Sequence, residues 1–574
     1  MGQAGLGPKA KLRPGLWLAI GALLVVIGVA LAALTERSGG IRISDVRFKG
    51  ADGTTFSALL YQPRNATDQT PAPGVLAVHG YINTRETQSP FAIEFARRGY
   101  VVLALDQRGH GYSGGGATSK GFGGPEGLTY LRSLPFVDKD QIGLEGHSMG
   151  GWTVLAAAAV MPDAYRALVL EGSSTGAPFA KTGTPTWPRN TAVVYSRYDE
   201  FAPLMWQAPK AAAVGSTPKL EALFGTSVPV ETGRTYGDIA QGTARRLTQP
   251  VATHPGDHIS REAVADAADW FAQTLENKSL KGGTPRARGD QVWWGKEIGT
   301  GLALLGIGAL MLGLFDLLLG FGPFKALHTA PTATTRPRGV RWWVLWLLTA
   351  FVPALTYYLL PLALPLIKPS AIFPQGITNI LMLWALINVL LALVFGRLLG
   401  PKLRRPPQPW ALSLTLAVIV VGLLYGVTVL AGLVQVDFRF WVVALKPFSG
   451  RQAIAAVSYV VPFTLFVLIA FRGLDALATS PPRGHYAWAA GALASGFFVL
   501  TGAQYLILFA TGALPLPFEA LNAIVAIQFV PLLLGLGVLA VYTWRRTGSY
   551  VPGGLIGGLF ITWYMVAGTA THFG

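Results

Sequence analysis

The chain has 574 residues, of which 51% are hydrophobic and only 13% charged, and this balance excludes an ordinary soluble protein of that length. Its net charge of +17 comes from basic residues in short loops between apolar runs, so we exclude a nucleic-acid partner. Cysteine is absent, which excludes disulfides, thiolate catalysis and cysteine-ligated metal sites.

The first predicted element is an apolar run over residues 15–34, which is long enough to cross a bilayer as a helix. We interpret it as an uncleaved anchor, because the apolar core of a secretory signal peptide is only about 7–15 residues long. The alternative is a signal peptide, since Ala30-Leu31-Ala32 suits a cleavage site. Both interpretations export the residues that follow.

A soluble domain is predicted over residues 38–276, after a tail and anchor at 1–37. Its sequence begins with a hairpin pattern at 42–62 and continues with short apolar strands that alternate with helical segments. This alternation predicts an α/β fold with a doubly wound, mostly parallel sheet covered on both faces. Residues 277–297 are the predicted linker back to the membrane.

The stretch Gly146-His147-Ser148-Met149-Gly150 lies between a predicted strand and a predicted helix. This G-x-S-x-G pattern is typical of a sharp turn that lifts a serine hydroxyl above the edge of a sheet. The glycines leave room for the turn, and the following helix directs its N-terminus at the reacting carbonyl. We therefore predict that Ser148 is a nucleophile.

Two further stretches, Val78–Tyr81 (VHGY) and Asp106–Gly115 (DQRGHGYSGG), complete a resemblance to the α/β-hydrolase superfamily, on its serine esterase and peptidase side. The resemblance spans about 42–276. It implies a catalytic triad in the chain order serine, acid, histidine.

Two acids follow Ser148 at predicted strand ends, Glu171 and Asp199. The acid usually follows the later strand, so we favour Asp199 and keep Glu171 as the alternative. Two histidines, His254 and His258, lie in the loop before the last helix of the domain. We favour His258 as the base, because it lies in the turn that leads into that helix. His254 is the alternative, since Pro255 holds it in an extended backbone that suits a strand end.

The oxyanion donors that complete this machinery are predicted to be the backbone N–H groups of Met149 and Tyr81. In the predicted mechanism the histidine takes the serine proton, the acid orients the imidazole, and an acyl-enzyme forms and is hydrolysed by water. We expect no metal and no organic cofactor.

The region from residue 298 to 574 is predicted to be an all-α transmembrane bundle of about eight helices. The apolar runs are 298–322, 342–366, 376–396, 410–434, 452–471, 486–510, 520–543 and 550–571. Lysine and arginine concentrate in alternate loops, for example 323–341 and 397–409. The positive-inside rule then predicts nine spans, with the N-terminus cytoplasmic and the soluble domain on the outer face. Asp316 falls inside a run, and we expect it to make a helix-end or interhelical hydrogen bond.

The sequence therefore predicts a membrane-tethered serine hydrolase that cleaves ester or lipid acyl bonds. An alternative is a serine peptidase or acyl-peptidase with the same triad. An alternative of another class is a transporter or membrane scaffold with a non-catalytic domain, because eight further spans exceed what anchoring requires. The expected partners are a small-molecule, lipid or peptide substrate and membrane lipid.

Overall fold

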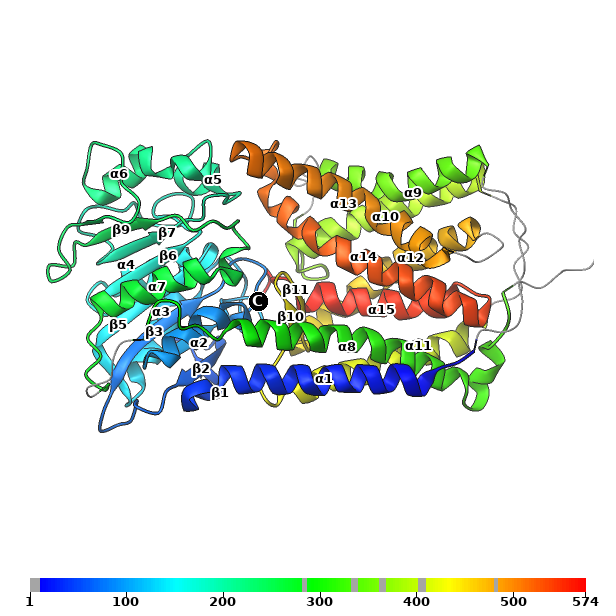
Figure 1. Cartoon of the computed structure of the whole chain (residues 1–574), viewed down its shortest axis with the longest axis horizontal. Coiled ribbons are helices and arrows are strands. Elements are labelled where there is room, and N and C mark those ends of the chain that lie inside the picture. The colour runs from blue at the N-terminus through cyan, green and yellow to red at the C-terminus, as the bar shows by residue number, and fades with distance from the viewer. Residues whose placement is uncertain (1–10, 281–285, 332–338, 361–367, 401–408, 479–483) are drawn as a thin grey trace, which may run out of the picture.

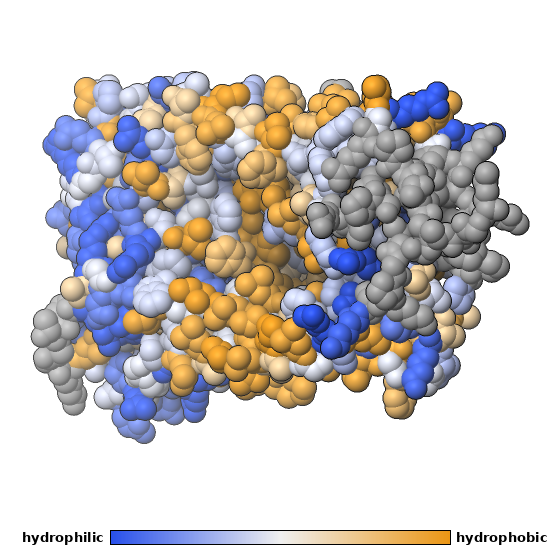
Figure 2. Space-filling view, turned by 45° about the vertical axis from the view of Figure 1, so that its right-hand side comes forward, coloured by the Kyte–Doolittle hydropathy of each residue, from blue (hydrophilic) through white to orange (hydrophobic). Residues whose placement is uncertain are grey.

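The computed structural model describes residues 11–280, 286–331, 339–360, 368–400, 409–478 and 484–574. An α/β domain lies at one end of the molecule and long apolar helices lie at the other (Figure 1). Hydrophilic side chains gather over the first part and apolar side chains over the junction and the helices (Figure 2). The predicted fold class, a mostly parallel α/β sheet with a helical region, is confirmed.

The α/β domain is built on a nine-stranded sheet in the order β1-β2-β4-β3-β5-β6-β7-β9-β8. Five neighbouring pairs, from β4-β3 to β7-β9, are parallel, and the pairs at the two edges are antiparallel. The strands are β1 Arg42–Lys49, β2 Thr55–Gln62, β3 Ala72–Val78, β4 Val101–Leu105, β5 Val137–His147, β6 Ala167–Glu171, β7 Thr191–Val194, β8 Thr235–Tyr236 and β9 Arg245–Thr248.

Helices cover both faces of this sheet because successive strand side chains point to opposite sides. Leu76 and Leu103 pack in a cluster with α3 and α4, whereas Val75 and Val102 pack in a second cluster with α2 and α7. The helices of the domain are α2 Ser89–Arg97, α3 Gly124–Ser133, α4 Met149–Val160, α5 Ala202–Trp206, α6 Pro218–Phe224 and α7 Arg261–Thr274. Both layers are apolar, as a doubly wound sheet requires.

Eight helices of the described chain are long and apolar enough to cross a membrane, by length and composition. These are α1 Pro14–Glu36, α8 Trp294–Leu319, α9 Val340–Leu359, α10 Gly376–Leu398, α11 Trp410–Gly432, α12 Gly450–Leu477, α13 His485–Thr511 and α14 Ala520–Thr547. The ninth predicted span, 550–571, is instead the shorter α15 Val551–Ala567, with 17 residues. Part of the second predicted run, 361–366, lies outside the described residues.

Helices α1 and α8 lie side by side although the whole α/β domain separates them in the chain (Figure 1). Glycines at their contact allow a close approach: a Cβ on Gly299 would lie 2.6 Å from the carbonyl oxygen of Gly28. Gly21 and Gly306 meet in the same way one heptad away. The α/β domain is therefore attached at both of its ends to one packed helix pair.

Asp316 of α8 is buried and forms an ion pair with Arg546 of α14. It also accepts hydrogen bonds from the Tyr542 hydroxyl at 2.7 Å and from the backbone N–H of Arg13 at 2.8 Å. These contacts join three helix ends, so the expected interhelical role is confirmed.

A β-hairpin from the helical region docks on the α/β domain. It contains β10 Phe438–Phe440 and β11 Val443–Leu445, and we call residues 437–446 the docking hairpin. Arg439 donates to the Thr87 hydroxyl at 2.9 Å, and Lys446 pairs with Glu86 at 2.8 Å. Trp441 donates to the Pro255 carbonyl oxygen at 2.6 Å. The hairpin thus fixes two separate loops of the α/β domain to the helices.

The pair of Glu86 and Lys446 is buried, so removing one partner leaves an uncompensated charge. Burial alone would raise the pKa of Glu86, but Lys446 and Arg85 outweigh it and hold that pKa well below its usual range. We expect Lys446→Met to lower the free energy of unfolding by about 3–5 kcal/mol. Thermal unfolding in detergent measures this effect.

The matched control is Lys120→Met, which breaks an exposed pair with Asp52 and is expected to leave the free energy of unfolding nearly unchanged, because water screens exposed charges. The double variant Glu86→Gln/Lys446→Met is expected to regain most of the lost stability. Equal effects of Lys446→Met and Lys120→Met would contradict the prediction.

Candidate active site

The turn that carries Ser148 joins the end of β5 to the first residue of α4. The backbone of Ser148 has φ +55° and ψ −122°, a strained conformation for a residue with a side chain. A Cβ on Gly150 would collide with the Val78 carbonyl oxygen, so only glycine fits there. The predicted strand-turn-helix setting of the serine is therefore present.

Asp199 lies just after β7 and holds the ring of His254. Its Oδ2 accepts a hydrogen bond from His254 Nδ1 at 2.7 Å. The other oxygen, Oδ1, accepts from the Phe201 backbone N–H at 2.7 Å and from the Tyr195 hydroxyl at 3.2 Å. With both oxygens occupied, Asp199 has a fixed orientation and fixes the imidazole in turn.

The parallel pairing of β7 with β9 continues beyond both strands and explains why His254 meets Asp199. Tyr198 and Thr253 form a parallel bridge, and the Tyr198 N–H donates to the Ala252 carbonyl oxygen at 3.0 Å. The next residue is therefore Asp199 in the first of these two segments and His254 in the second, so the two side chains are neighbours. A strand end followed by proline is the sequence signal for this position.

The prediction that His258 pairs with Asp199 is wrong. His258 lies four residues beyond His254, in a 3-10 turn at Asp257–Ile259, and the chain has folded back there. The His258 ring is buried, and its centroid lies 4.1 Å from the centroid of the His147 ring. Neither nitrogen of the His258 ring has a hydrogen-bond partner in the described structure. Burial and the neighbouring histidines lower the pKa of His258 well below its usual value.

Glu171, the alternative acid, does not contact either histidine through a hydrogen bond. Both of its carboxyl oxygens are buried without a partner among the described residues. Burial, reinforced by the Glu145 carboxyl, raises the pKa of Glu171 well above its usual range. Its backbone carbonyl accepts from the Ser148 N–H at 2.8 Å, so Glu171 supports the turn rather than the base.

The predicted oxyanion donors, Met149 and Tyr81, both line the cavity in front of Ser148. Neither backbone N–H donates to another group in the described part of the chain. The Tyr81 hydroxyl hydrogen-bonds His572 Nε2 at 2.9 Å, and a loop that begins at Gly80 thereby meets a segment beyond α15. Sequence reasoning missed His572, because no local pattern links it to residue 81.

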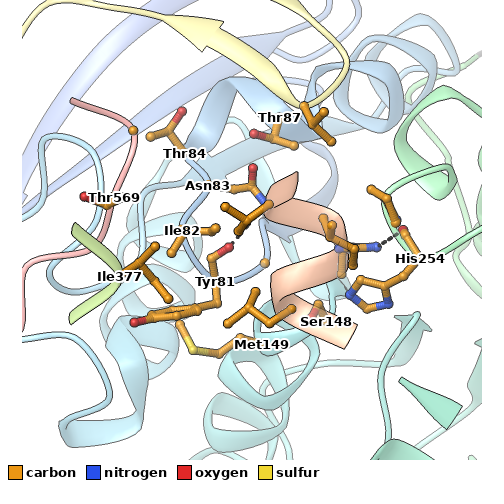
Figure 3. A pocket seen from close by; sticks show the side chains of 18 of the residues that line it. Tyr81, Ile82, Asn83, Thr84, Thr87, Ser148, Met149, His254, Ile377 and Thr569 are labelled. Atoms are coloured by element: carbon orange, nitrogen blue, oxygen red, sulfur yellow. Dashed lines mark hydrogen bonds between the residues drawn. The ribbon is translucent and has the colours of Figure 1, made fainter. Parts of the chain in front are cut away.

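A cavity of about 370 Å³ opens in front of the serine. Ser148 and His254 both line it, and Figure 3 shows them at the same end, next to Met149. Ile377 and Thr569 line it from the helical region. Further walls come from α14, α15 and the docking hairpin, namely Leu521, Ile524, Val525, Tyr564, Met565, Trp441 and Val442. Mostly apolar groups from both parts of the molecule thus enclose the candidate site.

Charged groups surround the His254 ring on several sides. Burial opposes protonation, but Asp199, Glu200 and Asp257 outweigh it and raise the pKa of His254 above its usual value of 6.5. Glu200 accepts from the His254 backbone N–H at 2.7 Å and from the Tyr505 hydroxyl of α13 at 2.7 Å. His254 is therefore connected through Glu200 to a helix of the bundle.

This environment predicts the acid limb of the pH profile. A base must be neutral to act, so kcat/KM is expected to fall as pH drops through the raised pKa of His254, with a midpoint above pH 6.5. Burial and the Asp199 charge raise the pKa of Glu200 to about 7, so this carboxyl is only partly charged near the midpoint. Glu200→Gln removes that partial charge and is expected to move the midpoint slightly to lower pH. The exposed Glu231→Gln is the control. A wild-type midpoint at or below 6.5 would refute the assignment.

Within the described residues, no group of three or more histidines or acids is arranged to hold a metal ion.

Comparison with known proteins places the α/β domain among hydrolases. Residues 69–198 match the family described as serine aminopeptidase, S33. The chain is 32% identical over 149 residues to a monoacylglycerol lipase of Mycolicibacterium smegmatis, which covers 23% of this chain and 48% of the lipase. It is 29% identical over 153 residues to human dipeptidyl peptidase 8, covering 24% of this chain and 17% of the peptidase.

A third relative is a thiohydrolase of Aspergillus aculeatus, 32% identical over 124 residues, covering 20% of this chain and 37% of that protein. The chain spans less than half the length of each of these three relatives. Their names denote a lipase, a peptidase and a thiohydrolase, so they support hydrolase chemistry across several kinds of bond.

Proposed function

Since the α/β domain of this chain belongs to the α/β-hydrolase superfamily, we propose that the protein is a membrane-embedded serine hydrolase that cleaves carboxylic esters with an apolar acyl group. Ser148 is the nucleophile, His254 the base and Asp199 the acid that orients the base. The support for these roles is the strained serine turn and the 2.7 Å hydrogen bond between Asp199 and His254.

In the proposed reaction His254 Nε2 takes the Ser148 proton while the serine oxygen attacks the ester carbonyl. The N–H groups of Met149 and Tyr81 receive the developing oxyanion. His254 then protonates the leaving alcohol, and an acyl-enzyme remains on Ser148. Water activated by the same imidazole releases the acid and restores the serine.

The apolar cavity is the single observation that favours an ester with an apolar chain. Its walls include Ile377, Leu381 and Val525, which belong to helices that qualify as membrane spans. A peptide substrate would need polar partners for its backbone groups on such walls, because buried amides without hydrogen bonds are unfavourable. An apolar acyl chain needs none.

We place the α/β domain on the outer face of the membrane, in line with the distribution of lysine and arginine between the loops. Protease accessibility of intact cells or right-side-out vesicles tests this placement. Digestion of the α/β domain only after permeabilisation would reverse it.

Labelling with a fluorophosphonate probe tests the catalytic proposal, and an ester panel tests the substrate class. We expect wild type to label and Ser148→Ala not to label. Wild type should hydrolyse p-nitrophenyl esters faster than aminoacyl-naphthylamides. The reverse preference would favour the peptidase alternative, and an unlabelled wild type would favour a transporter or scaffold with a non-catalytic domain.

A further inference from the structure

A second apolar hollow lies beside the catalytic cavity, between the α/β domain and the ends of α13 and α14 nearest to it. We call it the lateral groove. It has a volume of about 1120 Å³ and is lined on the helix side by Phe498, Gly502, Phe509 and Val530. Figure 2 shows a face of the molecule with a hollow at the junction, where apolar side chains gather.

The lateral groove is open and its apolar side chains face outward. Phe498 is 66% exposed and Phe509 is 50% exposed, and both lie on α13. On the other wall, Val251 and Ile259 come from the loop that carries His254, and they are also exposed. Helices α13 and α14 both qualify as membrane spans, so Phe498 and Phe509 would face lipid hydrocarbon rather than water.

The lateral groove and the catalytic cavity share one wall, the turn of the docking hairpin. Trp441 and Val442 line both spaces. They form a two-residue turn between β10 and β11, in which Trp441 has φ +52°. Such turns strongly favour glycine or asparagine at this position, so the bulky Trp441 occupies it against its backbone preference.

The side chain of Trp441 makes a specific contact with the α/β domain. Its indole N–H donates to the carbonyl oxygen of Pro255, the residue after the candidate base. Here a tryptophan from the helical region closes the space between the groove and the loop that carries His254. Trp441 thereby forms a partition between Ser148 and any acyl chain that lies in the lateral groove along the helices.

We propose that the substrate is an ester dissolved in the bilayer, whose acyl chain enters sideways along the lateral groove and passes Trp441 to reach Ser148. This inference rests on the proposed function and specifies its substrate as a membrane-resident lipid ester. The wall that the groove shares with the catalytic cavity at Trp441 and Val442, and its position against the apolar helices α13 and α14, are the observations that identify the occupant.

Gly502 provides a direct test because a Cβ there would meet nothing within 4 Å. Gly502→Phe therefore fills the lateral groove without disturbing the helix. Gly422→Phe in α11 is the matched control, because Gly422 also has open space around it and lines neither cavity. Both variants are reconstituted in phosphatidylcholine vesicles.

Two esters with the same leaving group are compared, p-nitrophenyl palmitate within the vesicles and water-soluble p-nitrophenyl acetate. We expect Gly502→Phe to lower the palmitate-to-acetate ratio of kcat/KM at least tenfold and Gly422→Phe to leave this ratio as in wild type. Equal ratios in all three proteins would overturn lateral entry while the proposed function stands. A wild type that hydrolyses neither ester and does not label would overturn the proposed function itself.

A second measurement uses the Ser148→Ala protein with an intact groove. A palmitate ester that carries a diazirine near the end of its chain is incorporated in the same vesicles and photolysed. We expect crosslinks on α13 or α14 within the lateral groove, at residues such as Phe498, Tyr505 or Val530. Crosslinks confined to other helices would overturn the proposal.

Discussion

Replacing His254 by alanine is expected to lower kcat/KM for a carboxylic ester by roughly 10⁴–10⁶-fold. The Ser148 hydroxyl would lose the group proposed to remove its proton, the imidazole that Asp199 orients. Steady-state hydrolysis of a p-nitrophenyl ester, together with the rate of fluorophosphonate labelling, measures the loss.

His258→Ala is the informative comparison, because this ring is buried nearby without a hydrogen bond to Asp199. We expect it to lower kcat/KM less than tenfold and to lower thermal stability through the cavity that the missing ring leaves. A larger loss of activity in His258→Ala than in His254→Ala would show that the wrong histidine has been assigned as the base.

Asp199→Asn is expected to lower kcat by about 10⁴-fold with little change in the fold. An asparagine side chain can still occupy the space between Tyr195 and Phe201, but its amide cannot stabilise the imidazolium as a carboxylate does. It also presents N–H groups to the ring, which favours the tautomer that cannot accept the serine proton. Single-turnover acylation with a p-nitrophenyl ester isolates this step.

The pH profile distinguishes a positioning role of Asp199 from a merely structural one. Without the Asp199 charge the pKa of His254 is expected to fall, so the acid limb of Asp199→Asn should move to lower pH. Glu171→Gln is the control, since the Glu171 carboxyl makes no hydrogen bond in the described structure. An unshifted acid limb in Asp199→Asn would argue against the pair.

Local sequence patterns were sufficient to predict the strand-turn-helix setting of Ser148 and to select Asp199, which hydrogen-bonds a histidine in the structure. The Ser148 turn depends on glycines within a few residues of it, and Asp199 lies a short loop beyond the apolar strand Thr191–Val194. The choice between His254 and His258 depended on the register of β9 beside β7, which is a long-range property. Pro255 favours an extended backbone at His254 and so indicates a strand end there, whereas the turn before α7 favours His258.

The walls of the site were beyond prediction from the sequence. Ile377, Trp441 and Thr569 are apolar or small residues in or next to segments that read only as membrane spans and loops. Nothing local distinguishes a residue that faces a cavity from one that faces lipid. The docking hairpin was hidden for the same reason, because its partners Glu86 and Pro255 lie 360 and 186 residues away in the chain from Lys446 and Trp441.

The pairing of α1 with α8 has a consequence for how the protein is made. The two helices that meet at Gly28 and Gly299 are synthesised far apart in time, with the entire sheet emerging between them. The first helix must wait unpaired in the bilayer, or with an assembly factor, until the second is inserted. Slowing the membrane insertion of α8 should therefore leave a population of molecules in which the α/β domain is folded but the helix bundle is not assembled.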